Sequence, residues 1–196
     1  MTAKIKLNAA SGGGSFSLQA PSSSSNNRVF TLPDVADATL LTSNSSTGKI
    51  LQVIQTKDIA EFSTTSTSAV EYAGINTTIT PSSASNKILI NVSLAVGASG
   101  NDNGQFGFLL YNGSSEITDA TNTNVTNQTA AVIRMLNQFD AQQLNMQYLY
   151  SPNTTSAITI KVYAKGDTLR TLYLNRYGAG TGRGGVSSMI LMEVAG

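Results

Sequence analysis

Apolar and polar residues alternate along most of the chain, which is the period of a β-strand with one buried face. Near the N-terminus this alternation covers 4–8, 15–19 and 28–32. The run Gly12-Gly13-Gly14 separates the first two stretches, and Pro21 with the serines after it separates the second from the third. These breaks predict three short strands. Because so few short strands cannot enclose a core, we expect other chains or another protein to stabilise this arm.

The alternation returns at Lys49 and continues towards the C-terminus. The stretch 87–96 is almost continuously apolar, which indicates a central strand. Asn112-Gly113 predicts a hairpin, because both residues accept the positive φ angles of a type I′ turn. Long connections such as 114–130 are more typical of a jelly roll than of a simple meander. Strands are predicted over 50–56, 70–80, 87–96, 105–111, 114–117, 131–139, 142–150, 157–164, 169–175 and 186–194.

Helical periodicity is weak throughout the sequence. The best candidate is 134–139, but its β-rich surroundings favour a strand. Many short strands separated by Ser, Thr, Asn and Gly turns are typical of a sandwich. We therefore predict an all-β fold, an antiparallel jelly-roll-like sandwich with a short N-terminal β-arm. The predicted parts are an arm at 1–34 for anchoring and trimerisation, a polar linker at 35–48 and a jelly-roll head at 49–196.

The composition argues against several classes of function. The 196 residues include no Cys, no His and no Trp, so a disulfide, a thiolate zinc site and a histidine base are all excluded. Twelve Lys and Arg against eleven Asp and Glu lack the basic footprint of a nucleic-acid binder. No apolar run approaches the about 20 residues of a membrane span, and no signal peptide is apparent. We expect a non-enzymatic protein without cofactor, metal, nucleic-acid or membrane partner.

The polar surface is expected to carry hydroxyl and amide groups rather than charges. Ser, Thr and Asn make up about a third of the chain, whereas only 12% of residues are charged. Such a surface is typical of extracellular or virion β-proteins, and a chain without an export signal fits a virion component released by lysis. Few charges also leave a monomer open to self-association, so we expect a specified oligomer.

One catalytic alternative remains, a carboxylate pair of the glycoside-hydrolase type. Its candidate acids lie in predicted loops or at strand ends, where solvated turn residues are usual, so a polysaccharide depolymerase is the least favoured hypothesis. The glycine-rich stretch 178–185 lacks the Lys-Ser/Thr ending of a phosphate-binding loop and opens no helix. The candidate acids are Asp102, Glu116, Asp119, Asp140 and Asp167.

Several sequence blocks resemble those of tailed-phage proteins. The stretch 5–21, IKLNAASGGGSFSLQAP, and FTLP at 30–33 resemble the N-terminal module of many tail-fibre or structural proteins, particularly of marine phages and cyanophages. The blocks TPSSASNKILI at 80–90, SPNTTSA at 151–157, LYLNR at 172–176 and MILMEV at 189–194 resemble the globular domain that follows. The resemblance implies a bacteriophage virion protein, a homotrimer whose head is similar to the C1q and tumour necrosis factor sandwiches. It does not distinguish tail from capsid.

Two groups of residues are candidates for contacts with other molecules. The apolar residues of the arm are expected to anchor it and to join the trimer, whereas loops on a rigid sandwich usually carry binding functions. The arm candidates are Ile5, Leu7, Phe16, Leu18, Val29, Phe30 and Leu32. The loop candidates are Asn101, Asp102, Asn103, Asn122, Asn124, Tyr177 and Arg183.

These observations lead to one favoured function and two alternatives. The favoured function is a short tail-fibre-like or other surface-exposed appendage of a phage virion, anchored by its arm to capsid or tail proteins and attaching to a host glycan or protein. Multivalent weak binding would then supply avidity. The alternatives are a capsid decoration protein, which bridges capsomers without binding a host, and a carbohydrate-binding lectin module.

Overall fold

The computed structural model describes residues 4–8, 10–19, 22, 23, 25, 49–100, 104–121, 130–136, 141–166, 170–177 and 184–196. The chain divides into two compact units, Met1–Asn44 and Ser45–Gly196. This division falls inside the linker predicted over 35–48. The division into arm, linker and head at residues 34 and 48 stays a prediction.

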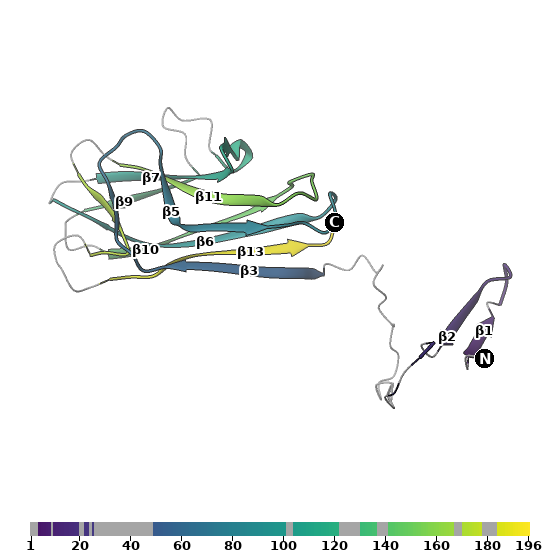
Figure 1. The fold of residues 1–196 in the computed structure, drawn as a ribbon. Helices are drawn as coiled ribbons and strands as arrows, with labels where there is room; N and C mark the ends of the chain where they lie inside the picture. The colour runs from purple at the N-terminus through teal and green to yellow at the C-terminus, as the bar shows by residue number, and fades with distance from the viewer. Residues whose placement is uncertain are drawn as a thin grey trace. The chain divides into compact units, whose positions relative to one another are not determined.

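The N-terminal unit contains an antiparallel hairpin of β1 (Lys4–Asn8) and β2 (Ser15–Gln19) (Figure 1). The chain reverses at the glycine run, where Gly12 and Gly13 have φ angles of 82° and 70°. Such positive angles cost glycine little because it has no Cβ. The third strand predicted for the arm, at 28–32, lies outside the described residues.

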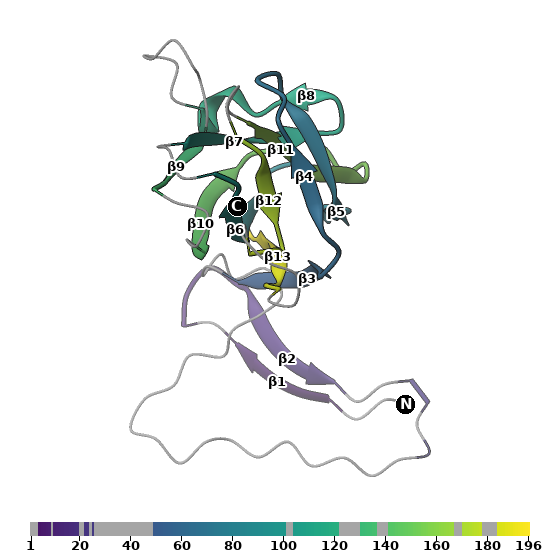
Figure 2. The same cartoon turned by 90° about the vertical axis from the view of Figure 1, so that its left-hand side faces the viewer.

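The second unit is a two-layer sandwich of antiparallel sheets (Figures 1 and 2). Its helical content in the described residues is the short 3-10 turn η1 (Thr118–Ala120). No helix among those residues has the length and apolar character to cross a membrane. The strands are β3 (Ile50–Asp58), β4 (Phe62–Thr64), β5 (Val70–Ile79), β6 (Lys87–Ala98), β7 (Gly104–Asn112), β8 (Ser115–Glu116), β9 (Ala131–Met135), β10 (Ala141–Tyr150), β11 (Ile158–Lys165), β12 (Leu172–Leu174) and β13 (Ser187–Val194).

The strand pairing is nested. In the first sheet, β3 pairs with β13 and β6 pairs with β10, while β12 and β4 continue the sheet beside the C-terminal half of β6. In the second sheet, β5 pairs with β11, and β7 pairs with β8 and β9. The first strand of the unit thus pairs with the last, the next with the one before it, and so on inwards. This is the pairing of one long hairpin rolled into two sheets, a jelly roll, and the predicted fold class is confirmed.

The strand predictions differ from the structure in two informative places. The three-residue strand β4 was not predicted, because three residues are too short to display an alternating pattern. The hairpin after β7 exists, but Asn112 still belongs to the strand and pairs with Ser115. The turn is therefore Gly113-Ser114, in which only Gly113 has a positive φ, 60°. The type I′ turn centred on Asn112 and Gly113 is wrong; glycine in the first position is typical of a type II′ turn.

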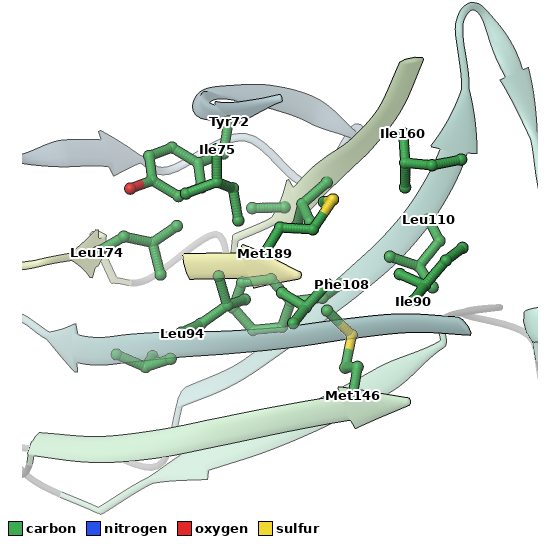
Figure 3. Packing of buried hydrophobic residues seen from close by; sticks show 14 of the residues in the cluster. Tyr72, Ile75, Ile90, Leu94, Phe108, Leu110, Met146, Ile160, Leu174 and Met189 are labelled. Atoms are coloured by element: carbon green, nitrogen blue, oxygen red, sulfur yellow. The ribbon is translucent and has the colours of Figure 1, made fainter. Parts of the chain in front are cut away.

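The hydrophobic core fills the space between the two sheets (Figure 3). In β6, alternate residues from Ile88 to Leu94, including Ile90 and Val92, are buried, and the residues between them are half-buried. The strand lies between β13 and β10, which confirms its predicted central position. Phe108 and Met189 meet this row from the two sheets (Figure 3). Each such side chain contributes about 2 kcal/mol through removal of apolar surface from water.

Candidate interaction surfaces

The predicted contact residues of the arm are only partly within the described part of the chain. In the hairpin, Ile5 is opposite Leu18 and Leu7 is opposite Phe16. Directly opposite positions of an antiparallel pair share a face, so these four positions lie on one face of the hairpin. Ile5 and Leu7 are 64% and 60% exposed. Their role in anchoring or trimer contacts stays a prediction. Val29, Phe30 and Leu32 lie outside the described residues.

Of the predicted loop residues, Tyr177 lies within the described part of the chain and lines a groove. The groove has a volume of about 560 Å³ and is built on the first residues of β10, which include Gln142 and Gln143. Its other lining residues are Ala95, Val96, Ala141, Arg176, Gly184 and Gly185. Asn101, Asp102, Asn103, Asn122, Asn124 and Arg183 lie outside the described residues.

Two amides, a guanidinium and a phenol line the groove, while alanine, valine and glycine provide its apolar part. The Arg176 guanidinium is fixed by an ion pair with Glu61 at 2.5 Å and lies 4.4 Å from the centre of the Tyr173 ring. The hydrogen bond to Glu61 raises the pKa of Arg176 above its ordinary value. The amides and the phenol of the groove can donate hydrogen bonds to hydroxyl groups and accept them, and the guanidinium can donate.

A buried polar cluster fixes the strand end from which this groove begins. Asn175, with a φ of 61°, donates from Nδ2 to the Tyr72 hydroxyl at 2.7 Å and to the Ala60 carbonyl at 2.9 Å. Its Oδ1 accepts a hydrogen bond from Ser187 Oγ at 2.7 Å. The Tyr72 hydroxyl in turn donates to Asp58. Burial and the Asp58 carboxylate both raise the Tyr72 pKa, so the phenol stays protonated as a donor.

The first sheet has an outer face that no second layer covers in the described unit. Leu89 lies between the buried residues Ile88 and Ile90, so it points away from the core. The register places Leu89 opposite Leu149 on β10 and opposite Met192 on β13. Met192 is in turn opposite Val53 on β3. An apolar row therefore crosses four of the six strands of this sheet.

We call the residues Leu51, Val53, Leu89, Leu149 and Met192 the apolar patch. Val53 is 57% exposed, and Leu51 and Leu149 are each 45% exposed. The next row along the same face, Gln55, Ile190, Asn91 and Gln147, is mixed, and the following one is polar. In that polar row Ser93 Oγ donates to Asn145 Oδ1 at 2.7 Å. The apolar character is thus confined to one end of the face.

The patch and the groove lie at opposite ends of this sheet. The patch includes Leu149 near the end of β10, whereas the groove includes Gln142 near its beginning. Gln142 and Leu149 are seven positions apart on this extended strand, about 23 Å. The chain enters this unit through β3, whose first residues are next to Val53. The patch therefore lies at the end where the linker joins the sandwich, and the groove lies at the far end.

A buried carboxylate stabilises the patch end from inside. Glu193 on β13 is 1% exposed and accepts hydrogen bonds from Gln52 Nε2, Ser82 N and Asn86 Nδ2, each at 2.6 Å. Burial alone would raise the pKa of this carboxyl, but the hydrogen bonds from Asn86, Gln52 and Ser82 outweigh it and lower the pKa to about 2. The charge is satisfied by hydrogen bonds that join β3, β13 and the loop before β6.

The sequence analysis did not identify the patch. Its strands contain apolar residues at consecutive positions, as in Ile88-Leu89-Ile90 and Leu191-Met192. Only one of each two neighbours faces the core, because successive side chains of a strand point to opposite sides. The signal in the sequence was an apolar residue at a strand position whose side chain points away from the core.

Two of the five carboxylates considered for catalysis, Glu116 and Asp119, lie within the described residues. Glu116 accepts a hydrogen bond from Thr121 Oγ1 at 2.8 Å, and Asp119 is exposed on η1. Asp102, Asp140 and Asp167 lie outside the described residues. Elsewhere, Glu71 has its pKa lowered by hydrogen bonds from Asn76 and Lys161. Among the described residues, no group of three or more Asp and Glu is arranged to hold a metal ion.

This chain was compared with known protein families, curated proteins and solved structures, and it matches solved structures at low sequence identity. No family model and no curated protein matches the chain. A structure of infectious bursal disease virus, Gx strain, is 13% identical over 96% of this chain and 48% of its own, with a TM-score of 0.38. The VP2 subviral particle of the same virus is 10% identical over 91% and 49%, with a TM-score of 0.36. The tripod from the baseplate of bacteriophage Tuc2009 is 11% identical over 90% and 80%, with a TM-score of 0.21.

This chain spans about half the length of each of the two bursal disease virus chains. At these identities and TM-scores the likeness carries no argument about function.

Proposed function

We propose that this protein is a non-enzymatic structural component of a phage virion, a short fibre-like or other surface appendage. Its N-terminal arm anchors it to capsid or tail proteins, and its jelly-roll head, present as a homotrimer, faces outwards. The virion surface is thus its location. A capsid decoration protein is the alternative with the same fold and the same arm.

One observation supports this proposal: the two ends of the first sheet differ in their exposed residues. The first residues of β3 and the apolar patch lie at one end of the first sheet, and a polar groove lies at the other. The resemblance of the arm to tailed-phage modules and the low charge of the chain support a virion role. The exposed Ile5 and Leu7 give the arm an apolar surface for anchoring.

Deleting residues 1–34 is expected to leave a folded head that no longer joins the particle. The reason is that the deletion removes the β1–β2 hairpin but no residue of the sandwich. Quantitative mass spectrometry of purified particles would measure copies of full-length and truncated protein, and circular dichroism would confirm that the truncated head is folded. A few trimers of full-length protein per particle support the appendage, and hundreds support decoration. Truncated protein incorporated as well as full-length protein would contradict anchoring by the arm.

Glycan binding at the groove is a second candidate function, favoured by the lining of Gln142, Gln143 and Tyr177. Amide groups exchange hydrogen bonds with sugar hydroxyls, and an aromatic side chain offers an apolar face with one polar end. Arg176 adds a donor that is fixed by Glu61. A host-surface polysaccharide is therefore the class of ligand that the groove fits.

Replacing Gln142 with alanine is expected to weaken binding to host polysaccharide about tenfold, the effect of one lost hydrogen bond at a desolvated site. Binding of the intact protein to polysaccharide extracted from the host would be measured by biolayer interferometry. Gln105→Ala is the matched control, because Gln105 is an exposed glutamine on β7, outside the groove and on the other sheet. Equal effects of the two substitutions would exclude the groove. Cleavage of the polysaccharide by the protein would contradict the non-enzymatic proposal.

A further inference from the structure

The apolar patch is suited to contact with a partner, because it leaves apolar side chains exposed or half-exposed to water across four neighbouring strands of the first sheet. Its row Val53, Met192, Leu89 and Leu149 is continuous from the edge strand β3 to β10. Single exposed apolar residues are ordinary on protein surfaces, but a contiguous group marks an interaction site. Elsewhere in the described residues, Val132 and Leu136 on or beside β9, and Ile59 and Val186 near the groove end, are also exposed. None of these forms a row across a sheet.

The apolar patch and the residues around it have the composition of a protein–protein interface. The patch itself contains no charged residue, and the neighbouring row supplies the amides of Gln55, Asn91 and Gln147. An apolar centre with a polar rim is the usual composition of a subunit contact. The outward lysines on these strands, Lys57 and Lys87, lie outside the patch, where their charged ends can stay in water.

The position at which the chain enters the sandwich indicates which molecule covers the apolar patch. The linker from the arm joins the sandwich at β3, directly before Leu51 and Val53. In the proposed homotrimer, associated arms tether this end of every sandwich to one assembly. Each patch then lies within reach of the patch on a neighbouring copy. A foreign protein would have no such constraint to bring it to this end of the sheet.

We propose that the apolar patch is the contact between the heads of identical copies, so that each head packs against its neighbours through the linker end of the β3-β13-β6-β10 sheet. This inference rests on the proposed homotrimer and adds the surface that forms it. The groove at the other end of the sheet stays accessible in such an assembly, and copies of the groove point in a common direction.

Val53→Glu and Leu149→Glu are expected to weaken self-association of the full-length protein by about 100-fold each, because an unpaired carboxylate would be buried at an apolar contact. Sedimentation velocity at micromolar concentration would measure the mass against the 20.5 kDa of one chain. The matched control is Asn145→Asp, which adds one negative charge on the same face and strand as Leu149 but in the polar row. The control is expected to retain the mass of the wild type.

The outcomes separate the two proposals. A wild-type protein with the mass of one chain would overturn the homotrimer and this contact together. A wild-type oligomer that Val53→Glu and Leu149→Glu leave intact would overturn the contact and leave the oligomer standing. Dissociation of both variants with an intact control supports the contact. Circular dichroism checks folding, and the neutral variants Val53→Thr and Leu149→Gln replace any charged variant that does not fold.

Discussion

Replacing Glu193 with glutamine is expected to lower the free energy of unfolding by about 3 kcal/mol at neutral pH. The Glu193 carboxylate is the common acceptor for Gln52 on β3 and for Ser82 and Asn86 in the loop before β6. Glutamine has the same shape but brings an amide NH2 group towards these donors and removes the charge that strengthens each bond. The substitution would therefore weaken the hydrogen bonds that join the loop before β6 to the end of β13.

The effect depends on pH in a defined direction. The pKa of Glu193 in the folded protein is about 2, below the ordinary value of 4.5 that applies to the unfolded chain. A depressed pKa contributes stability that is fully present above about pH 4.5 and is lost as the pH falls towards 2. The difference between wild type and Glu193→Gln is therefore expected to be largest at neutral pH and to shrink between pH 4.5 and 2.

Urea unfolding at a series of pH values would measure both effects. Asp119→Asn is the matched control, because it removes one negative charge from an exposed acid without changing a buried cluster. Its stability is expected to stay within about 0.5 kcal/mol of the wild type. Equal stability of Glu193→Gln and wild type at pH 7, or a difference that does not change with pH, would show that the carboxylate is not the acceptor that holds this cluster.

The sandwich could be predicted from the sequence because apolar and polar residues alternate along its strands, as expected when one face of each strand is buried. In β11 and β13, buried and half-buried residues alternate without interruption. The sequence predicts the fold class but not the individual strand pairs. Alternation indicates which face of a strand is buried but not which strand lies beside it. Long-range pairs such as β3 with β13 are decided by the packing of the whole sandwich.

The polar clusters and the apolar patch required the structure. Glu193 has the same phase in its strand as Met189 and Leu191, so alternation predicts an inward carboxylate. The sequence does not show that the amides of Gln52 and Asn86 donate hydrogen bonds to this carboxylate, which is why its charge can be buried. The same limit applies to Leu149, which is apolar in the outward phase of its strand and becomes part of a patch only beside Leu89.

Replacing Asn175 with alanine is expected to lower the free energy of unfolding by about 3 kcal/mol. Two separate effects contribute. The side chain joins Ala60, Tyr72 and Ser187 in a cluster of which Asn175 itself is 4% exposed, so its removal leaves buried polar atoms without partners. In addition, the positive φ of 61° is tolerated better by asparagine than by alanine.

A second asparagine in the chain separates these two effects. Asn153 also has a positive φ, 52°, but it is exposed in the loop between β10 and β11. Asn153→Ala is expected to cost about 1 kcal/mol, the backbone contribution alone. Asn153→Gly is expected to be nearly neutral, whereas Asn175→Gly should still cost about 2 kcal/mol because it restores the backbone freedom but not the hydrogen bonds.

Equilibrium unfolding of the four variants would decide between a conformational and a hydrogen-bonding role. Equal losses for Asn175→Ala and Asn153→Ala would mean that the buried cluster adds no stability, and Asn175→Gly would then behave like the wild type. The expected order places Asn175→Ala lowest in stability, followed by Asn175→Gly, Asn153→Ala and Asn153→Gly. Because Arg176 and Tyr177 follow Asn175 directly, a loosened cluster is also expected to displace the groove, so Asn175→Gly should weaken polysaccharide binding although Asn175 does not line the groove.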